Sequence, residues 1–155
     1  MECVISFVGV ACSGNFYTPV DIKMPLLRIE KIMDTLYPRL IVTDRAHEEE
    51  ARQFAGEAEI LIYESIQMQK ADSTAVQSSL RSIVDTDVLY VMFTSGSTGV
   101  PKGAILSHRA VADFVSWAVE CFALDDTVII GNQEPFYFSG SIFDLYVTLA
   151  VGGTM

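Results

Sequence analysis

The chain has 155 residues, enough for one hydrophobic core and too few for two ordinary domains. Ten Lys and Arg against 20 Asp and Glu give a formal net charge of −10, which disfavours binding to nucleic acid or anionic lipid. Hydrophobic residues make up 50% of the chain, which excludes intrinsic disorder, and the longest apolar stretch, Val4 to Cys12, is too short to span a bilayer. We therefore expect a folded protein without nucleic-acid or membrane partners. Its three cysteines, Cys3, Cys12 and Cys121, form no CxxC pair and no metal-ligand spacing, which favours reduced thiols in a cytoplasmic protein.

Helical and extended patterns alternate in the first half of the chain. Val4 to Ala11 is apolar and fits either a helix or a buried strand. From Pro25 to Pro38, apolar residues recur with the spacing of an amphipathic helix, at Ile29, Ile32, Met33 and Leu36. The segments expected next are a strand over Leu40 to Thr43, a polar helix over His47 to Phe54 and a strand over Glu59 to Tyr63.

The second half begins with a polar stretch, residues 65–82, which we expect to be a surface excursion of a single domain that spans 1–155. The elements expected after it are a central strand over Asp87 to Thr94, a helix capped by Ser107, a strand over Thr127 to Ile130, and a helix from Ser141 to Ala150 that ends at Gly152 and Gly153. Alternating strands and helices predict an α/β fold with a largely parallel sheet flanked by helices.

One loop carries clear chemical information. Between Thr94 and Gly103, three glycines allow backbone amides to approach an anion closely, hydroxyl side chains add donors, and Lys102 adds a positive charge. Such a loop suits the phosphates of a nucleotide. Its spacing matches neither the GxxxxGK[ST] phosphate loop nor the GxSxG hydrolase turn. A flexible Ser/Gly linker is the alternative, but a linker has no reason to follow an apolar central strand.

Three segments resemble one family, the adenylate-forming enzymes. The segment YVMFTSGSTGVPKG, Tyr90 to Gly103, closely resembles the phosphate-loop signature of acyl-CoA synthetases, peptide-synthetase adenylation domains and D-alanine-carrier ligases. Gly14 to Ile29 and Asn132 to Gly153 are similar to an earlier motif and to the start of the acyl pocket in the amino-acid-activating branch. The resemblance covers nearly the whole chain and implies part of the large N-terminal domain of such an enzyme.

The resemblance implies an ATP-dependent ligase that joins a small carboxylate, an amino acid or an analogue, to AMP and then passes the acyl group to a carrier-protein thiol, coenzyme A or a similar acceptor. It implies ATP and Mg²⁺ as cofactors, with the Mg²⁺ ligands outside this chain. The residues it assigns to the phosphates are Thr94, Ser95, Gly96, Ser97, Thr98 and Gly99, with Lys102 as the catalytic cation. It places Phe138 and Ser139 at the substrate.

Ser139 departs from the family pattern. Amino-acid-activating relatives follow the motif Phe with an Asp that binds the substrate ammonium, whereas Ser139 offers only a neutral hydroxyl. The later motifs of the family are also absent, so we expect a fragment of a synthetase that is inactive alone. The alternative is a non-catalytic remnant that binds a phosphate-bearing ligand or a partner subunit.

Smaller expectations concern four further side chains. Arg28 and Asp21 are expected to fix a loop-to-helix turn, and Trp117 to pack against a neighbour. Cys121 is expected in the core, because no base or cation beside it in the sequence argues for a reactive thiol.

Overall fold

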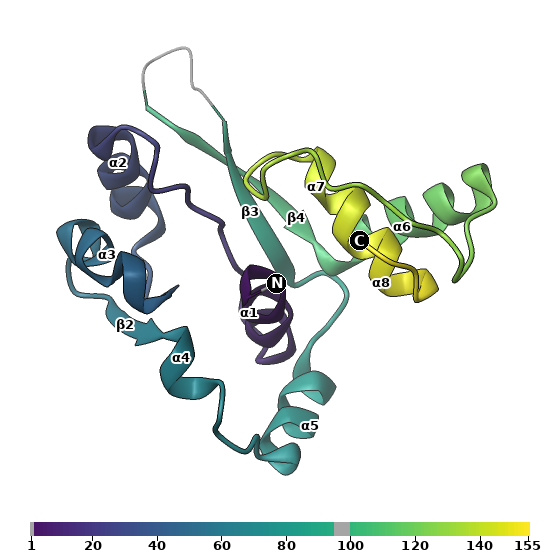
Figure 1. Ribbon diagram of the computed structural model, residues 1–155, viewed down its shortest axis with the longest axis horizontal. Coiled ribbons are helices and arrows are strands. Elements are labelled where there is room, and N and C mark those ends of the chain that lie inside the picture. The colour runs from purple at the N-terminus through teal and green to yellow at the C-terminus, as the bar shows by residue number, and fades with distance from the viewer. Residues whose placement is uncertain (1, 95–99) are drawn as a thin grey trace.

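The computed structural model describes residues 2–94 and 100–155 and shows two small β-sheets with helices around them (Figure 1). In chain order the elements are α1 (Glu2–Cys12), α2 (Leu26–Leu36), β1 (Leu40–Thr43), the 3-10 turn η1 (Arg45–His47), α3 (Glu48–Phe54), β2 (Glu59–Ile62), α4 (Tyr63–Ile66), α5 (Ser73–Ser82), β3 (Val88–Thr94), β4 (Lys102–Ser107), α6 (His108–Phe122), α7 (Gly140–Ile142), the π-helical turn η2 (Phe143–Val147) and α8 (Thr148–Val151). The predicted α/β class is confirmed.

The first sheet is parallel, as the alternation of helix and strand predicted. β1 and β2 pair in register from Leu40 opposite Glu59 to Thr43 opposite Ile62, and α3 connects them. The predicted helix after Pro25 is α2, whose Ile29 and Ile32 are buried. Burial of this apolar stripe explains why the i, i+3 pattern in the sequence identified the helix.

The second sheet is an antiparallel hairpin of β3 and β4. Val91 pairs with Ile105 and Phe93 with Gly103. The sequence predicted a strand at β3 but not this pairing. Residues 95–101 are too few for the crossover that a parallel pair needs, so the two strands can only run antiparallel.

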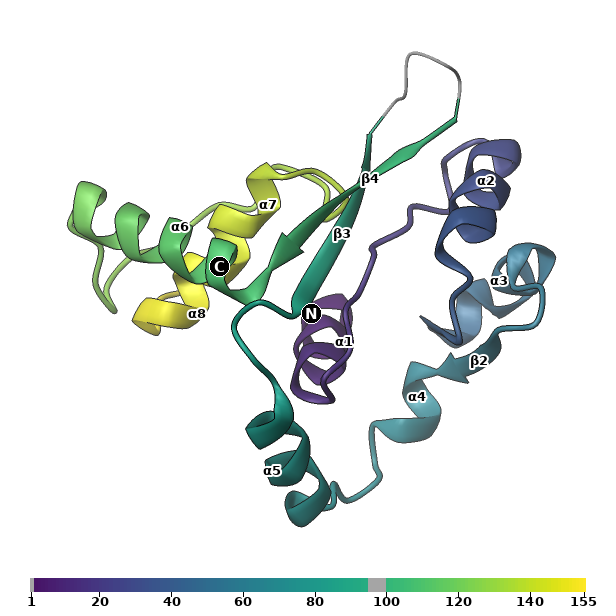
Figure 2. The same cartoon turned by 180° about the vertical axis from the view of Figure 1, so that it is seen from behind.

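The main hydrophobic core joins β3 to the C-terminal helices. Its buried residues come from five parts of the chain: Tyr17, Leu89, Tyr90, Val111, Val115, Ala118, Ile142 and Val147. Ser107 begins α6 as predicted, because its side chain accepts a hydrogen bond from the Ala110 amide at 3.2 Å. Figure 2 shows the hairpin between α6–α8 on one side and α2 and α3 on the other.

The C-terminal segment differs from its prediction in two places. The helix expected over Ser141 to Ala150 is present as α7, η2 and α8, with a π-helical turn in its middle, and it ends at Gly152, whose φ is +73°. The strand expected over Thr127 to Ile130 is wrong, because Ile129 makes only a single bridge, to Thr154, and is 80% exposed. A β-branched run becomes a strand only where a partner lies beside it.

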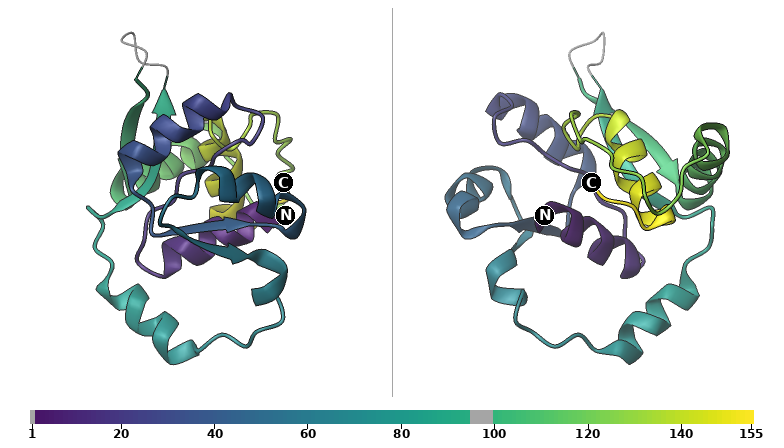
Figure 3. Two further views of the ribbon diagram at one scale, coloured as in Figure 1. Left: turned by 90° about the vertical axis from the view of Figure 1, so that its left-hand side faces the viewer. Right: turned by 45° about the vertical axis from the view of Figure 1, so that its right-hand side comes forward.

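The polar segment at residues 65–82 contains α5, which stands away from the hairpin (Figure 3). The sequence predicted a polar surface excursion here and no helix. Asp72 was the available signal, because its side chain caps the helix by accepting hydrogen bonds from the Thr74 and Ala75 amides at 2.9 and 3.2 Å.

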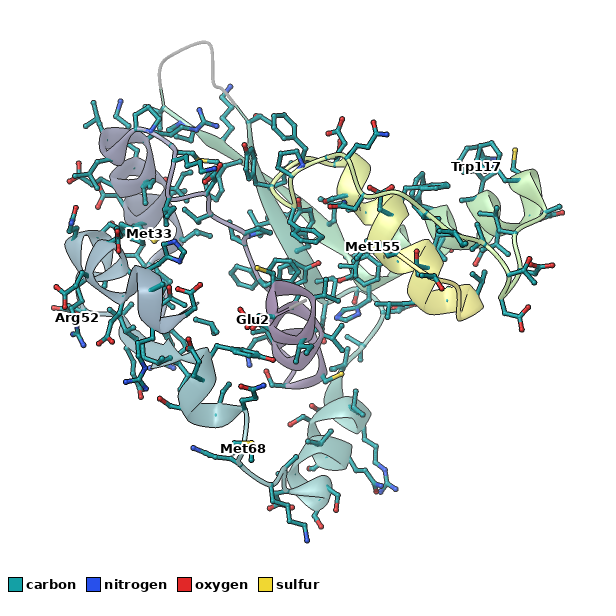
Figure 4. All side chains as sticks on the ribbon, viewed as in Figure 1. Glu2, Met33, Arg52, Met68, Trp117 and Met155 are labelled. Carbon is teal, nitrogen blue, oxygen red and sulfur yellow. The ribbon has the colours of Figure 1, made fainter. Side chains whose placement is uncertain are left out.

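Three aromatic side chains are exposed along α6, Phe114, Trp117 and Phe122. Trp117, at the far end of α6 in Figure 4, is 55% exposed and lies edge-on to Phe122 with ring centroids 6.0 Å apart. Its expected packing against a neighbour is confirmed. The expectation for Cys121 is wrong, since this thiol is exposed on the same helix. Within residues 2–94 and 100–155, no helix has the length and apolarity needed to cross a membrane.

Gly153 is required by close packing. A Cβ atom at Gly153 would lie 2.6 Å from Val128 Cγ1 and 2.9 Å from the Val128 carbonyl oxygen, whereas at Gly131 nothing lies within 4 Å. We expect Gly153→Ala to lower the free energy of unfolding by about 1–3 kcal/mol, measured by urea denaturation. Gly131→Ala is the matched control, and equal stability of the two variants would contradict this packing.

Candidate functional site

The predicted phosphate loop connects β3 to β4 and so lies at the loop end of this hairpin. Thr94 ends β3, Lys102 begins β4, and the two are cross-strand partners. The Thr94 hydroxyl lies 3.5 Å from the Lys102 carbonyl oxygen, and both side chains are exposed. Ser95, Gly96, Ser97, Thr98 and Gly99 lie outside the described residues. The hairpin thus places the exposed side chains of Thr94 and Lys102 on neighbouring strands at its loop end.

Arg28 ties this end of the hairpin to α2. Its Nη2 donates a hydrogen bond to the Phe93 carbonyl at 3.4 Å. The sequence predicted that Arg28 fixes its own turn, but the side chain reaches β3 instead. Asp21 does fix the turn, because its carboxylate accepts from the Lys23 amide at 2.8 Å.

Gly103 is enclosed by the strand opposite it. A Cβ atom there would lie 3.0 Å from Val91 Cγ1 and 3.3 Å from Phe93 Cζ. The aromatic ring therefore covers the glycine of its cross-strand partner, an arrangement that fixes strand register. The sequence predicts a role for this glycine in backbone freedom, whereas in the structure its lack of a side chain makes room for Phe93.

Phe138 and Ser139 lie at the start of the C-terminal helices. Phe138 is 51% exposed, and Ser139 is exposed and makes no capping hydrogen bond with its side chain. Ser141, only 4% exposed, donates from Oγ to the Phe138 carbonyl at 2.7 Å, and the same Oγ lies 3.2 Å from the Phe136 carbonyl. Sequence reasoning missed Ser141, which positions the turn that carries the two predicted substrate residues.

Buried tyrosines join the three motif segments. The hydroxyls of Tyr17 and Tyr146, 129 positions apart, lie 2.8 Å from each other. The Tyr90 hydroxyl donates to the Phe136 carbonyl at 3.2 Å, and the rings of Tyr17 and Tyr90 are in contact with centroids 5.2 Å apart. The phosphate-loop strand is therefore fixed to the Phe138 turn through Tyr90, a role that no local sequence pattern reveals.

Burial raises the pKa of these phenols. Desolvation is the main cause in each case: it raises the pKa of Tyr90 to about 12, and the pKa values of Tyr17 and Tyr146 also rise. The pKa of Tyr137 rises through desolvation and through its hydrogen-bonded neighbour Asp21. All four side chains are neutral near pH 7 and serve as hydrogen-bonding groups.

No group of three or more His, Cys, Asp or Glu side chains in the described part of the chain is arranged to hold a metal ion. A surface hollow is lined by Trp117, Glu120 and Cys121. Trp117 lies on the opposite side of the molecule from Met33 of α2 (Figure 4).

Comparison with known proteins identifies the family. The chain matches the family described as AMP-binding enzyme over residues 1–155. It belongs to that family. The resemblance inferred from the three motif segments is therefore confirmed.

Individual relatives agree with this assignment. The chain is 34% identical over 156 residues to a D-alanine--D-alanyl carrier protein ligase of Lacticaseibacillus casei and 29% identical over 154 residues to one of Bacillus thuringiensis. Each alignment covers 99% of this chain and 30% of the relative, so the chain spans about a third of the length of these ligases.

Solved structures show the same fold. ATP-bound MatB from Rhodopseudomonas palustris matches with a TM-score of 0.77 at 20% identity, covering 99% of this chain and 32% of MatB. VinN matches with a TM-score of 0.80 at 15% identity, covering 99% of this chain and 41% of VinN. The fold is part of the N-terminal domain of adenylate-forming enzymes.

The raised tyrosine pKa values predict alkaline sensitivity. A phenol that keeps its proton in the folded state stabilises the protein fully below the unfolded pKa of 10.0, and this contribution is lost as pH rises above that value, up to about 12 for Tyr90. We expect the free energy of unfolding, measured by urea denaturation, to fall between pH 10 and 12. Compared with the wild-type protein, Tyr90→Phe should show a smaller fall. Tyr37→Phe should show the same fall as the wild type, because Tyr37 is 81% exposed. An equal fall in all three proteins would contradict the assignment.

The Tyr17–Tyr146 contact predicts energetic coupling between the first and third segments. In a double-mutant cycle of Tyr17→Phe and Tyr146→Phe, we expect a coupling energy of about 1 kcal/mol, because either single change leaves the other hydroxyl without its partner. Chemical denaturation measures each corner of the cycle. Strictly additive effects would show that the hydrogen bond contributes no net stability.

Proposed function

We propose that this protein uses ATP to activate a small carboxylate. The carboxylate oxygen attacks the α-phosphorus, the bond to the bridging oxygen breaks, and pyrophosphate leaves as the acyl-adenylate forms. The observation that carries the proposal is the hairpin that places Thr94 opposite Lys102 at both ends of the glycine-rich loop, in a chain that matches the AMP-binding family throughout. ATP-bound MatB supports the choice of nucleotide.

The proposed roles follow from the charge that develops in the reaction. Thr94 and the five residues Ser95 to Gly99 bind the β- and γ-phosphates with hydroxyl and amide donors. Lys102 neutralises the negative charge that accumulates on the leaving pyrophosphate. The paired strands on both sides of the loop fix the backbone positions of Thr94 and Lys102 relative to each other, from which both side chains can reach the same phosphates.

The relatives support an amino acid or an analogue as the carboxylate and a carrier-protein thiol as the acyl acceptor. Similar sequences are named D-alanyl carrier protein ligases, VinN is described in complex with 3-methylaspartate and with L-aspartate, and a similar chain is the peptide synthetase FmoA3. We place Phe138 and Ser139 beside this substrate. The thiolate of the acceptor would attack the acyl carbon and release AMP.

Lys102→Ala tests whether Lys102, at the loop end of the β3–β4 hairpin, neutralises the leaving pyrophosphate. In the full-length protein, we expect carboxylate-dependent exchange of pyrophosphate into ATP to slow by about 100-fold, because the leaving group loses its cation, while the KM for the carboxylate changes by less than about threefold. Lys70→Ala, an exposed lysine beyond α4, is the matched control.

Each outcome of that experiment decides a separate point. Unchanged exchange in Lys102→Ala would contradict the role of Lys102. Absence of exchange in the wild-type protein with every carboxylate, together with tight ATP binding, would identify the non-catalytic alternative.

A further inference from the structure

In the proposed substrate site, the position at which the family resemblance implies a carboxylate is occupied by Ser139. The family resemblance implies an acidic side chain after Phe138, and Ser139 provides only a hydroxyl. A hydroxyl has no charge with which to balance a substrate ammonium that has left water. Recognition of an amino acid therefore needs a carboxylate from another residue.

Gly140 leaves the space for such a group, and Glu134 fills it. A Cβ atom at Gly140 would lie 3.0 Å from Glu134 Cγ and 3.5 Å from Glu134 Oε2. The carboxylate of Glu134 therefore lies against the backbone of the residue that directly follows Ser139. Any side chain at residue 140 would compete with Glu134 for this volume.

Among the acidic residues around this turn, Glu134 has the unengaged carboxylate. Asp144 accepts a hydrogen bond from Asn132 Nδ2 at 2.9 Å, and Asp21 accepts from the Lys23 amide and lies in hydrogen-bond contact with Tyr137. Within residues 2–94 and 100–155 no hydrogen bond or ion pair engages the side chain of Glu134, which is exposed. Its carboxylate is available to a ligand.

Asn132 fixes the backbone from which Glu134 extends. The same Asn132 amide that contacts Asp144 lies 3.1 Å from the Glu134 carbonyl oxygen, which it uses as a second acceptor. Further along the turn, the Phe138 amide donates to the Pro135 carbonyl at 2.9 Å. The backbone that carries Glu134 and Phe138 is thus held by hydrogen bonds within the turn, and the Glu134 side chain extends from it beside Gly140.

We infer that Glu134 binds the ammonium group of an amino-acid substrate in place of the acidic residue that Ser139 replaces. This inference rests on the proposed function, since it assigns the substrate class of the same site. A charge-assisted hydrogen bond between a carboxylate and an ammonium is strong and selects amino acids over the corresponding carboxylic acids without an amino group. In the sequence, the residue that supplies this carboxylate lies five positions before Ser139.

The test compares substrates that differ only in the amino group. Exchange of pyrophosphate into ATP is measured in the full-length protein with alanine, β-alanine and propionate. We expect the wild-type protein to prefer one of the two amino acids to propionate. In Glu134→Gln, kcat/KM for that amino acid should fall by at least about tenfold, with propionate changed by less than about threefold.

A rescue variant separates recognition from folding. Adding Ser139→Asp to Glu134→Gln returns a carboxylate to the expected family position and should restore at least part of the preference for the amino acid. Glu57→Gln, at an exposed glutamate between α3 and β2, is the matched control and should leave all three rates unchanged. Equal unfolding midpoints of the variants would show that the single change acts on substrate recognition.

Failure of this inference differs from failure of the proposed function. Wild-type exchange with a preference for propionate, or a Glu134→Gln variant that keeps the preference for the amino acid, would overturn the role of Glu134 alone. Absence of exchange with all three acids and with a wider panel of carboxylates would overturn the proposed function and this inference together.

Discussion

The buried phenol of Tyr90 is the constraint on which the arrangement of the site depends. Tyr90 lies in the middle of β3 with 1% of its surface exposed, and its hydroxyl must find a partner because an unpaired buried hydroxyl is costly. That partner is the Phe136 carbonyl, just before the Phe138 turn. On either side of Tyr90, the Tyr17 amide donates to the Leu89 carbonyl and the Val91 amide donates to the Tyr17 carbonyl, at 3.3 and 3.0 Å. Strand β3 thereby fixes both the segment around Tyr17 and the turn around Phe136.

The hairpin is held by hydrogen bonds and an ion pair at its base, and its loop end carries the exposed residues Thr94 and Lys102. At the base, the His108 amide donates to the Asp87 carbonyl at 3.0 Å, and the Arg109 guanidinium pairs with Asp85. At the loop end, Arg28 reaches the Phe93 carbonyl, while Thr94 and Lys102 are exposed beyond it. The proposed binding and release of a polyphosphate needs this combination, because Thr94 and Lys102 must be positioned while their side chains stay exposed to the ligand.

At the turn proposed to bind the substrate, hydrogen bonds among neighbouring side chains decide which carboxylates are engaged. Asn132 engages Asp144 and so leaves Glu134 as the carboxylate open to a ligand among the described residues of this turn. Gly140 contributes by having no side chain, since any Cβ would meet Glu134. Tyr137 makes the corresponding contact with Asp21 of the first motif segment, so the turn is linked to that segment as well.

The sequence by itself determined the elements that depend on local patterns. The stripe of Ile29 and Ile32 identified α2, Ser107 identified the start of α6, and the glycine-rich loop identified the family before any fold was known. Only the tertiary structure decided which segments meet: the antiparallel pairing of β4, the single bridge at Ile129 in place of a strand, and the contacts of Tyr17 with Tyr146 and of Glu134 with Gly140. Helical spacing and capping are properties of adjacent residues, whereas hydrogen bonds between residues far apart depend on packing that no local pattern encodes.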